Sequence, residues 1–345
     1  MSTLLGAVVV GIAGLLLGSG VWPMKVMRKF QFEHWWFIGM LVGLIIMPWA
    51  ITLLFCPHAL AAYWSLTPGV LLKANTFALG WGIANILCGL CFVRIGFALT
   101  GGILTGLGIS VGVTVPMFVK GSGLFSQAPD WNSPAGRTVL IGVAIILVAV
   151  PLVSMAGFGR DRVLGKTHPG SSGSFRGGLI MAAIAGVLSA GLSFSFVYSQ
   201  GPILEAMKAR GAGEIPANFA VWAAGLFGGA LINVAYPAYL MTKKKSWNVL
   251  TQSWREVLLA AVIGINLIAG MALMGKGMLL LGALGASVGF GIQQALQVLG
   301  SQGVGFISGE WSGVHGKPRI QMYLAITILI LATIVMAYGN TLAKV

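Results

Sequence analysis

The chain has 345 residues, of which 57% are hydrophobic and only 8% are charged, whereas roughly a quarter of the residues in a soluble domain carry a charge. This composition cannot cover a surface that faces water, so it excludes an ordinary soluble protein and indicates an integral membrane protein. The net charge of +14 does not indicate a nucleic-acid-binding protein, because the Lys and Arg residues stand in small groups between apolar runs. We expect them in loops that face anionic lipid.

The apolar runs are long enough to cross a bilayer as helices, which takes about 20 residues each. The first run is a retained span and not a cleaved signal peptide, because its first basic residue, Lys25, follows the apolar stretch. The predicted fold class is therefore an all-α integral membrane protein of about ten transmembrane helices. In chain order the predicted spans are 3–22, 36–55, 75–93, 96–118, 138–158, 177–199, 217–241, 256–275, 278–299 and 319–339.

Most of the 21 Lys and Arg residues fall in the loops that follow the odd-numbered spans. Cytoplasmic loops retain such residues. We therefore expect these loops on the cytoplasmic side and both termini on the opposite side of the membrane.

Two short stretches of the first half recur in the second, which indicates an internal repeat. Ile12-Ala13-Gly14-Leu15-Leu16 is similar to Ile184-Ala185-Gly186-Val187-Leu188, and Asn85-Ile86-Leu87-Cys88-Gly89 is similar to Asn266-Leu267-Ile268-Ala269-Gly270. The second pair precedes two short basic turns, expected at Arg94-Ile95-Gly96 and Gly275-Lys276-Gly277. Chance matching among common apolar residues is the alternative.

Halves of five spans each must be inverted relative to one another, because five is odd, and many secondary transporters use this arrangement. We therefore predict a first five-helix repeat at 1–160, a basic linker at 161–176 and a second five-helix repeat at 177–345.

Motifs of enzyme and metal chemistry have weak support. The stretch from Gly159 to Thr167 looks like a phosphate loop, but its glycines are spaced by one residue too many and no strand precedes it. Cys88 and Cys91 have a metal-ligand spacing, yet they lie inside a span without a second pair. No catalytic cluster can be assembled from the scattered histidines. We expect neither an enzyme nor a protein with a metal or cofactor.

Polar residues in the middle of spans are candidates for binding a solute, because an unpaired amide in hydrocarbon is costly and tends to face a partner or a cavity. Amides supply donors and acceptors, and tryptophan rings cover the C–H face of a sugar. The alternative is that these amides only join helices by hydrogen bonds. The candidate substrate-binding residues are Trp22, Trp81, Asn85, Trp222, Asn233, Asn266 and Gln293.

A proton-coupled carrier usually has an ionisable group in its pathway, but every Glu here lies near the end of a predicted span. The candidate carboxylates are Glu33, Glu205, Glu256 and Glu310, and of these we expect Glu33, Glu205 or Glu310 to couple the proton. Each of them could equally be a solvated loop charge.

Several segments, in a shared order along the chain, resemble the L-rhamnose-proton symporter family, a branch of the drug/metabolite transporter superfamily. They are Pro48-Trp49-Ala50, the stretch from Trp81-Gly82-Ile83-Ala84-Asn85 to Gly89 and Arg94, Leu188-Ser189-Ala190-Gly191-Leu192-Ser193-Phe194, Gly228-Gly229-Ala230-Leu231-Ile232-Asn233 and Glu310-Trp311. The resemblance carries over Glu33, Trp81, Asn85, Glu205, Asn233 and Glu310 as shared features without an assigned role. The sequence departs from the family around Asn266 and around Gln293, Gln294 and Gln297.

The resemblance implies a carrier of the bacterial inner membrane that imports L-rhamnose or a related deoxyhexose or pentose with a proton by alternating access. Together with the loop charges, this predicts that both termini are periplasmic. No cofactor is implied, and the coupling ion is H⁺. The implied partners are a sugar and the lipid bilayer, without nucleic acid, for a monomer or homodimer. The alternative is a carrier of another small metabolite, such as an amino acid, without obligatory proton coupling.

Overall fold

The computed structural model describes residues 2–95, 97–118, 128–165, 172–282 and 285–342, and within these ranges the protein contains helices and no strand. The first half contains α1 (Ser2–Ser19), the 3-10 helix η1 (Trp22–Val26), α2 (Phe32–Met40), the π-helix η2 (Leu41–Ile46), α3 (Met47–Phe55), α4 (Ala59–Trp64), α5 (Pro68–Ile95), α6 (Phe97–Phe118) and α7 (Pro134–Val163). The second half contains α8 (Ser172–Ser189), α9 (Gly191–Lys208), α10 (Glu214–Gly225), α11 (Phe227–Lys244), the 3-10 helix η4 (Trp247–Thr251), α12 (Trp254–Leu281), the π-helix η6 (Gly285–Gly289), α13 (Phe290–Ile307) and α14 (Lys317–Leu342).

Within the described ranges, eight helical segments are long and apolar enough to cross a membrane, and the count rises to nine if α10 and α11 form one bent span. This confirms the all-α membrane fold and most of the predicted spans. It does not confirm the full count of ten, because the predicted span 278–299 covers the end of α12, η6 and the start of α13.

One predicted turn is wrong. Residues Gly275-Lys276-Gly277 lie inside α12, which continues to Leu281 and ends at Gly282, whose φ is +69°. Lys276 tolerates this helical position because its Nζ donates to Glu214 Oε1 at 3.0 Å, at an exposed end of both helices. The other predicted turn coincides with the break between α5 and α6, although Gly96 itself lies outside the described residues. Likewise α7 and α8 extend into the predicted linker, of which 166–171 lie outside the described residues.

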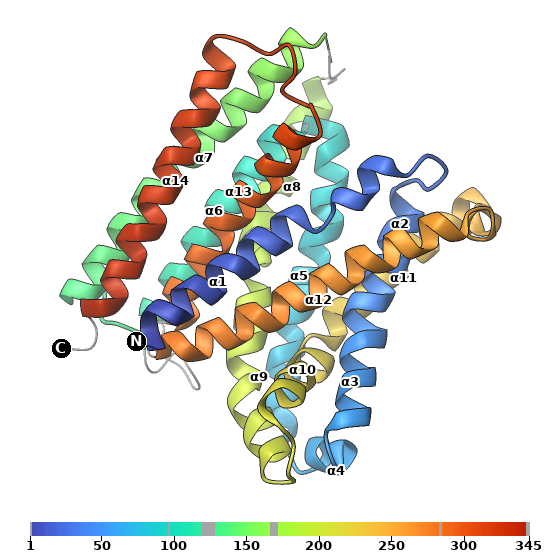
Figure 1. Ribbon diagram of the computed structural model, residues 1–345, viewed down its shortest axis with the longest axis vertical. Coiled ribbons are helices and arrows are strands. Elements are labelled where there is room, and N and C mark those ends of the chain that lie inside the picture. The colour runs from blue at the N-terminus through green and yellow to red at the C-terminus, as the bar shows by residue number, and fades with distance from the viewer. Residues whose placement is uncertain (1, 96, 119–127, 166–171, 283–284, 343–345) are drawn as a thin grey trace.

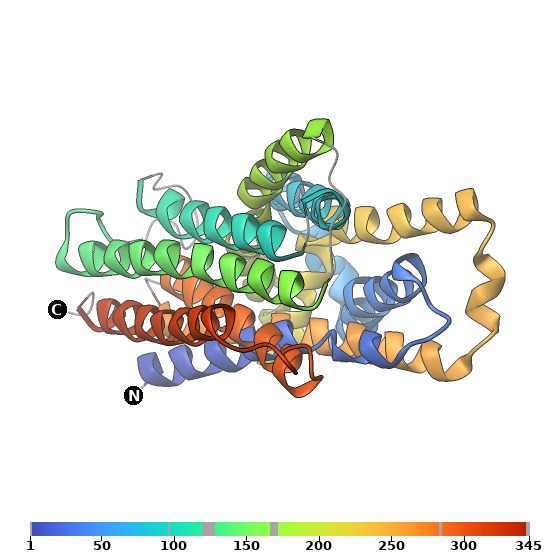
Figure 2. The ribbon, with the colours of Figure 1, turned by 90° about the horizontal axis from the view of Figure 1, so that it is seen from above.

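The helices pack side by side in a regular set of pairs (Figure 1). Helix α1 packs against α12 and α13, whereas α8 packs against α5 and α6. Helix α2 contacts α11 and α12, and α5 contacts α9 and α11. The pair α7 and α14 packs along its length on one side of the molecule, as seen from above in Figure 2. Two large apolar clusters fill the interior, one around α9, α10 and α12 and one around α6, α7, α13 and α14.

Two of the candidate spans are interrupted in their middle. The span from α2 to α3 contains the π-helix η2, where a Cβ on Gly43 would lie 2.5 Å from Gly264 O of α12. The span from α10 to α11 bends by 61° at Leu226. The bend at Leu226 releases backbone groups that need other partners, because lipid offers none.

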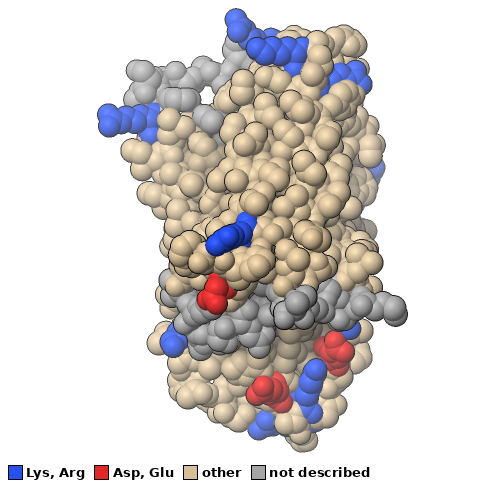
Figure 3. Space-filling view, turned by 90° about the vertical axis from the view of Figure 1, so that its left-hand side faces the viewer, with Lys and Arg blue, Asp and Glu red and all other residues tan. Residues whose placement is uncertain are grey.

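On the face shown in Figure 3, Lys and Arg cluster at the upper end. A broad surface of other residues separates them from the few basic and acidic side chains at mid-height and at the lower end. Many large apolar side chains, such as Leu54, Ile141 and Ile334, are exposed on the helices. An exposed apolar body with charged ends is the surface expected of a protein embedded in a bilayer.

Candidate functional site

Helices α5 and α11 meet at Trp81, Asn85 and Asn233. Asn85 Nδ2 donates to Asn233 Oδ1 at 3.1 Å, and Asn233 Nδ2 donates to Gly229 O at 2.9 Å. A Cβ on Gly229 would lie 2.4 Å from Ala78 O and 3.1 Å from the Trp81 ring, so the two helices approach at backbone distance. The structure thus brings three of the predicted residues together, with the Asn233 amide buried and both amides hydrogen-bonded within the protein.

The other predicted amides lie in the group of α1, α12 and α13. Asn266 Nδ2 donates to Gly20 O at 3.2 Å, directly after α1. Gln293 is fully buried on α13, where its Nε2 donates to Gln297 Oε1 and its Oε1 has no hydrogen-bond partner. Trp22 lies in η1 at the end of this group and is 46% exposed. Asn266 and Asn85 therefore have different partners, although the sequence pairs them as repeat counterparts.

The bend between α10 and α11 is held by side chains that the sequence analysis missed. Asn75 of α5 donates from Nδ2 to Ala224 O at 2.9 Å and accepts at Oδ1 from Gly228 N at 2.7 Å. Ser195 of α9 donates from Oγ to Gly225 O at 2.7 Å. These bonds satisfy backbone groups that the bend releases. Asn75 stands ten residues before Asn85 on α5, and both side chains bond to the segment from Ala224 to Asn233.

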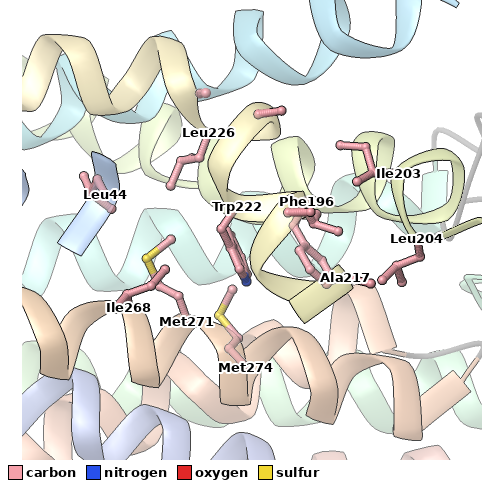
Figure 4. Packing of buried hydrophobic residues seen from close by; sticks show 14 of the residues in the cluster. Leu44, Phe196, Ile203, Leu204, Ala217, Trp222, Leu226, Ile268, Met271 and Met274 are labelled. Atoms are coloured by element: carbon pink, nitrogen blue, oxygen red, sulfur yellow. The ribbon is translucent and has the colours of Figure 1, made fainter. Parts of the chain in front are cut away.

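Trp222 lies deep in the apolar cluster around α9, α10 and α12. Its ring stacks on Phe196 with centroids 4.7 Å apart, and its Nε1 has no hydrogen-bond partner. Figure 4 shows Met271 and Met274 of α12 beside the indole. One turn earlier on α10, Asn218 Nδ2 donates to Ala272 O at 2.8 Å while its Oδ1 has no partner. Asn218 is a buried amide that the sequence analysis did not single out.

The predicted proton-coupling carboxylates have three different environments. Glu33, at the start of α2, is buried and accepts from Lys244 Nζ at 2.8 Å. Glu310, between α13 and α14, forms ion pairs with Lys25 and with Arg160, whose NH1 lies 2.7 Å from Oε2. Glu205 of α9 is exposed. Glu33 and Glu310 thus join segments of the first half of the chain to segments of the second.

The fourth candidate carboxylate, Glu256, was not expected to couple the proton. It is buried at the start of α12 and accepts hydrogen bonds from three successive backbone N–H groups, those of Arg28, Lys29 and Phe30, at 2.7 to 3.1 Å. Buried His34 adds a further contact nearby: its Nδ1 accepts from Gln31 N, and its Nε2 lies 3.1 Å from Ser246 Oγ. The start of α2 is therefore tied to the second half by Glu33, His34 and Glu256.

Within the described part of the chain, no group of three His, Cys, Asp or Glu residues could hold a metal ion. Cys56, Cys88 and Cys91 are free thiols. Burial raises the pKa of the Cys56 thiol, which lies just outside the span from α2 to α3, so this cysteine is protonated at neutral pH.

An all-helical membrane protein with a span that bends by 61° in mid-course, and with amides and indole groups in its interior, has the construction of a secondary transporter. Comparison with known proteins defines the class further. The family model of the L-rhamnose-proton symport protein matches residues 4–342. The L-rhamnose-proton symporter of Escherichia coli O17:K52:H18 is 27% identical over 345 residues, covering 96% of this chain and 98% of the relative. The symporter of Shigella boydii serotype 18 has the same identity and coverage.

The chain therefore belongs to the L-rhamnose-proton symporter family, which confirms the resemblance seen in the sequence. The members that match it are transporters and not enzymes.

Proposed function

We propose that the protein imports a neutral sugar, L-rhamnose or a related deoxyhexose or pentose, together with a proton across the bacterial inner membrane. The observation that carries the proposal is the family match over nearly the whole chain. The buried amides and indoles suit a neutral, hydroxyl-rich solute, since they offer donors and acceptors without a net charge.

We further propose ten spans in two inverted halves, 1–160 and 177–345, joined by the linker 161–176. The packing pairs support this arrangement. Each span of the first half then has a counterpart five spans later, so α1 corresponds to α8, α5 to α12 and α6 to α13. The contacts of α1 with α12 and α13 correspond to the contacts of α8 with α5 and α6, and both sets are present. The two interrupted spans, α2 to α3 and α10 to α11, are likewise counterparts. Breaks at corresponding positions of two halves point to the binding region of such transporters.

We propose that the substrate pathway lies between the halves and is lined by the candidates Trp81, Asn85, Asn233, Asn266, Gln293, Trp222 and Trp22. The hydrogen bonds from Asn85 to Asn233 and from Asn266 to Gly20 both join one half to the other. Alternating access requires such contacts to rearrange as the halves move, so these amides are suited to couple sugar binding to the motion.

For proton coupling, Glu33 is the best supported of the three candidates. It is buried, its partner Lys244 is 54% exposed, and the contact joins the two halves. Protonation would remove the carboxylate charge and release Lys244, which weakens one tie between the halves. Glu310 has two cationic partners, and Glu205 is exposed.

The basic ends of α7 and α11 lie at the same end of the molecule as Lys25 and Glu310. We assign this end of the molecule to the cytoplasmic side by the positive-inside rule. Both termini are then periplasmic.

Uptake of labelled L-rhamnose into proteoliposomes tests the proposal. An imposed inward proton gradient should drive accumulation, and dissipating the gradient should reduce uptake to equilibration. Glu33→Gln, Glu205→Gln and Glu310→Gln are tested side by side. The variant that lacks the coupling carboxylate, which we expect to be Glu33→Gln, should no longer accumulate rhamnose but should still exchange it across the membrane. Protein that carries another metabolite but not a sugar would contradict the proposal and favour the alternative substrate class.

A further inference from the structure

Unpartnered buried polar atoms concentrate in one region of the protein. Among the described residues, seven buried side-chain nitrogen or oxygen atoms have no hydrogen-bond partner. Five of them lie on α3, α9 and α10, three helices that pack around one apolar cluster, and belong to Trp49, Ser193, Gln200, Asn218 and Trp222. Leaving a buried donor or acceptor without a partner costs about 1–3 kcal/mol each. Each such group calls for an explanation, such as a water, an ion or a ligand that completes its bonds.

Asn218 and Phe196 converge on one point beside α12. A Cβ on Gly275 would lie 2.8 Å from Asn218 Oδ1 and 2.8 Å from the Phe196 ring. Phe196 in turn stacks on Trp222, and Asn218 and Trp222 stand four residues apart on the same face of α10. Asn218 is 6% exposed and Trp222 is 2% exposed. Two unpartnered polar groups and two aromatic rings therefore share a small region next to a glycine.

The donors and acceptors are those that a sugar needs. Asn218 Oδ1 accepts from a hydroxyl, and Trp222 Nε1 donates to a hydroxyl or a ring oxygen. The Asn218 amide is already oriented by its bond to Ala272 O, so it needs little ordering on binding. Met271 and Met274 add an apolar, adaptable side, as Figure 4 shows.

The helix that carries both residues is also placed to move. Helix α10 is a half-span of 12 residues that ends at the 61° bend, and it contacts α3 and η2 of the first half as well as α9 and α12 of the second. A ligand held by α10 can therefore influence the contact between the halves.

We infer that Asn218 and Trp222 of α10 are direct contacts of the transported sugar's hydroxyl groups once α10 moves away from Gly275, because in this conformation a Cβ on Gly275 would already lie 2.8 Å from Asn218 Oδ1 and from the Phe196 ring. The inference rests on the proposed function, and it separates these two residues from Asn85, Asn233 and Asn266, whose hydrogen bonds are made within the protein.

The test measures binding of L-rhamnose, and of L-rhamnose lacking the hydroxyl at C2, C3 or C4, to the purified full-length protein by calorimetry. Asn218→Ala and Trp222→Phe should each raise the Kd about tenfold, the effect of one lost hydrogen bond of about 1.4 kcal/mol. One deoxy sugar should bind wild type about tenfold more weakly than L-rhamnose, yet bind Asn218→Ala as well as L-rhamnose does. A residue with only a structural role would not produce this coupling.

The matched controls are Asn248→Ala and Trp64→Phe, because both side chains are exposed. They should bind as wild type does. Trp222→Phe keeps an aromatic ring in the stack and removes the N–H, so it remains informative if Asn218→Ala does not fold. The site would be overturned if the folded variants bound L-rhamnose with unchanged Kd. It would also be overturned if every deoxy sugar bound Asn218→Ala more weakly than L-rhamnose does, by the same factor as in the wild-type protein. A wild-type protein that binds no sugar would instead contradict the proposed function.

Discussion

At the scale of single residues, burial alone does not separate a binding group from a structural one. Asn85, Asn233 and Asn266 are amides in apolar spans, as the sequence shows, and the structure gives each of them a partner inside the protein. Asn218 and Trp222 retain unpartnered atoms. The sequence could identify Trp222 and the three paired amides as candidates, but the partners of an amide depend on helices far away in the chain, which no local pattern contains.

The hydrogen bond between Asn85 and Asn233 should stabilise the contact between α5 and α11. We expect a double-mutant cycle with Asn85→Ala and Asn233→Ala to give a coupling energy of about 0.5–1.5 kcal/mol, the range for side-chain bonds between membrane helices. The cycle is measured by unfolding in mixed detergent micelles. Pairing Asn85→Ala with Asn266→Ala serves as the control and should give additive losses, because the structure shows no bond between those two residues.

Glu256 should be a structural carboxylate. Its two oxygens accept from the N–H groups of Arg28, Lys29 and Phe30. A glutamine side chain at this position would turn its NH₂ group toward these backbone N–H donors. We therefore expect Glu256→Gln to lower the free energy of unfolding by roughly 2–3 kcal/mol, since bonds to a charged acceptor are strong. Glu214→Gln, at an exposed ion pair, should change it by less than about 1 kcal/mol. Equal losses in the two variants would contradict this role.

At the scale of helices, the sequence predicts where a membrane span lies along the chain better than where that span bends. Nine of the predicted spans overlap candidate membrane helices, because a long apolar run is a local signal. The π-helix η2 and the bend at Leu226 were not predicted. The bend depends on contacts such as those of Asn75 with Ala224 and Gly228, which join α5 to a segment about 150 residues later. The turn expected at Lys276 failed for a similar reason, since its partner Glu214 belongs to another helix.

The close approach of η2 and α12 depends on glycine. A Cβ on Gly43 would lie 2.5 Å from Gly264 O and 2.9 Å from Gly264 Cα, so Gly43→Ala must push the helices apart. We expect the free energy of unfolding to fall by about 1–3 kcal/mol and the melting temperature to fall with it. Gly201→Ala is the control, because a Cβ there meets nothing within 4 Å. It should leave stability unchanged or raise it by up to about 1 kcal/mol. A harmless Gly43→Ala would show that η2 does not need this contact.

At the scale of the whole molecule, acidic residues tie the two halves together at one end. Glu33 binds Lys244, Glu310 binds Lys25 and Arg160, and Glu256 holds the backbone at 28–30. At Glu214 and Lys276, by contrast, both partners belong to the second half. The shared basic end agrees with the loop charges in the sequence, whereas which charges form pairs could be seen only in the structure.

Removing the charge of Glu33 and Glu310 should favour separation of the two halves at the end where these ion pairs lie. Each pair with a solvent-accessible partner contributes up to about 1 kcal/mol, a shift of about fivefold in population. Spin labels at Arg28→Cys and Lys243→Cys, in a background without the native cysteines, report the distance between the halves. The combined variant Glu33→Gln and Glu310→Gln should increase the long-distance fraction, and Glu214→Gln should not. An unchanged distribution would show that these pairs do not hold the end closed.

Coupling of sugar to proton is the central claim, and it is tested most directly by sugar-induced proton entry. Proteoliposomes with a pH-sensitive dye inside, and no imposed gradient, receive labelled L-rhamnose outside. We predict that the lumen acidifies as rhamnose enters, and that protein-free vesicles and Glu33→Gln protein give no acidification. Entry of labelled rhamnose through the wild-type protein without any change in luminal pH would contradict the account.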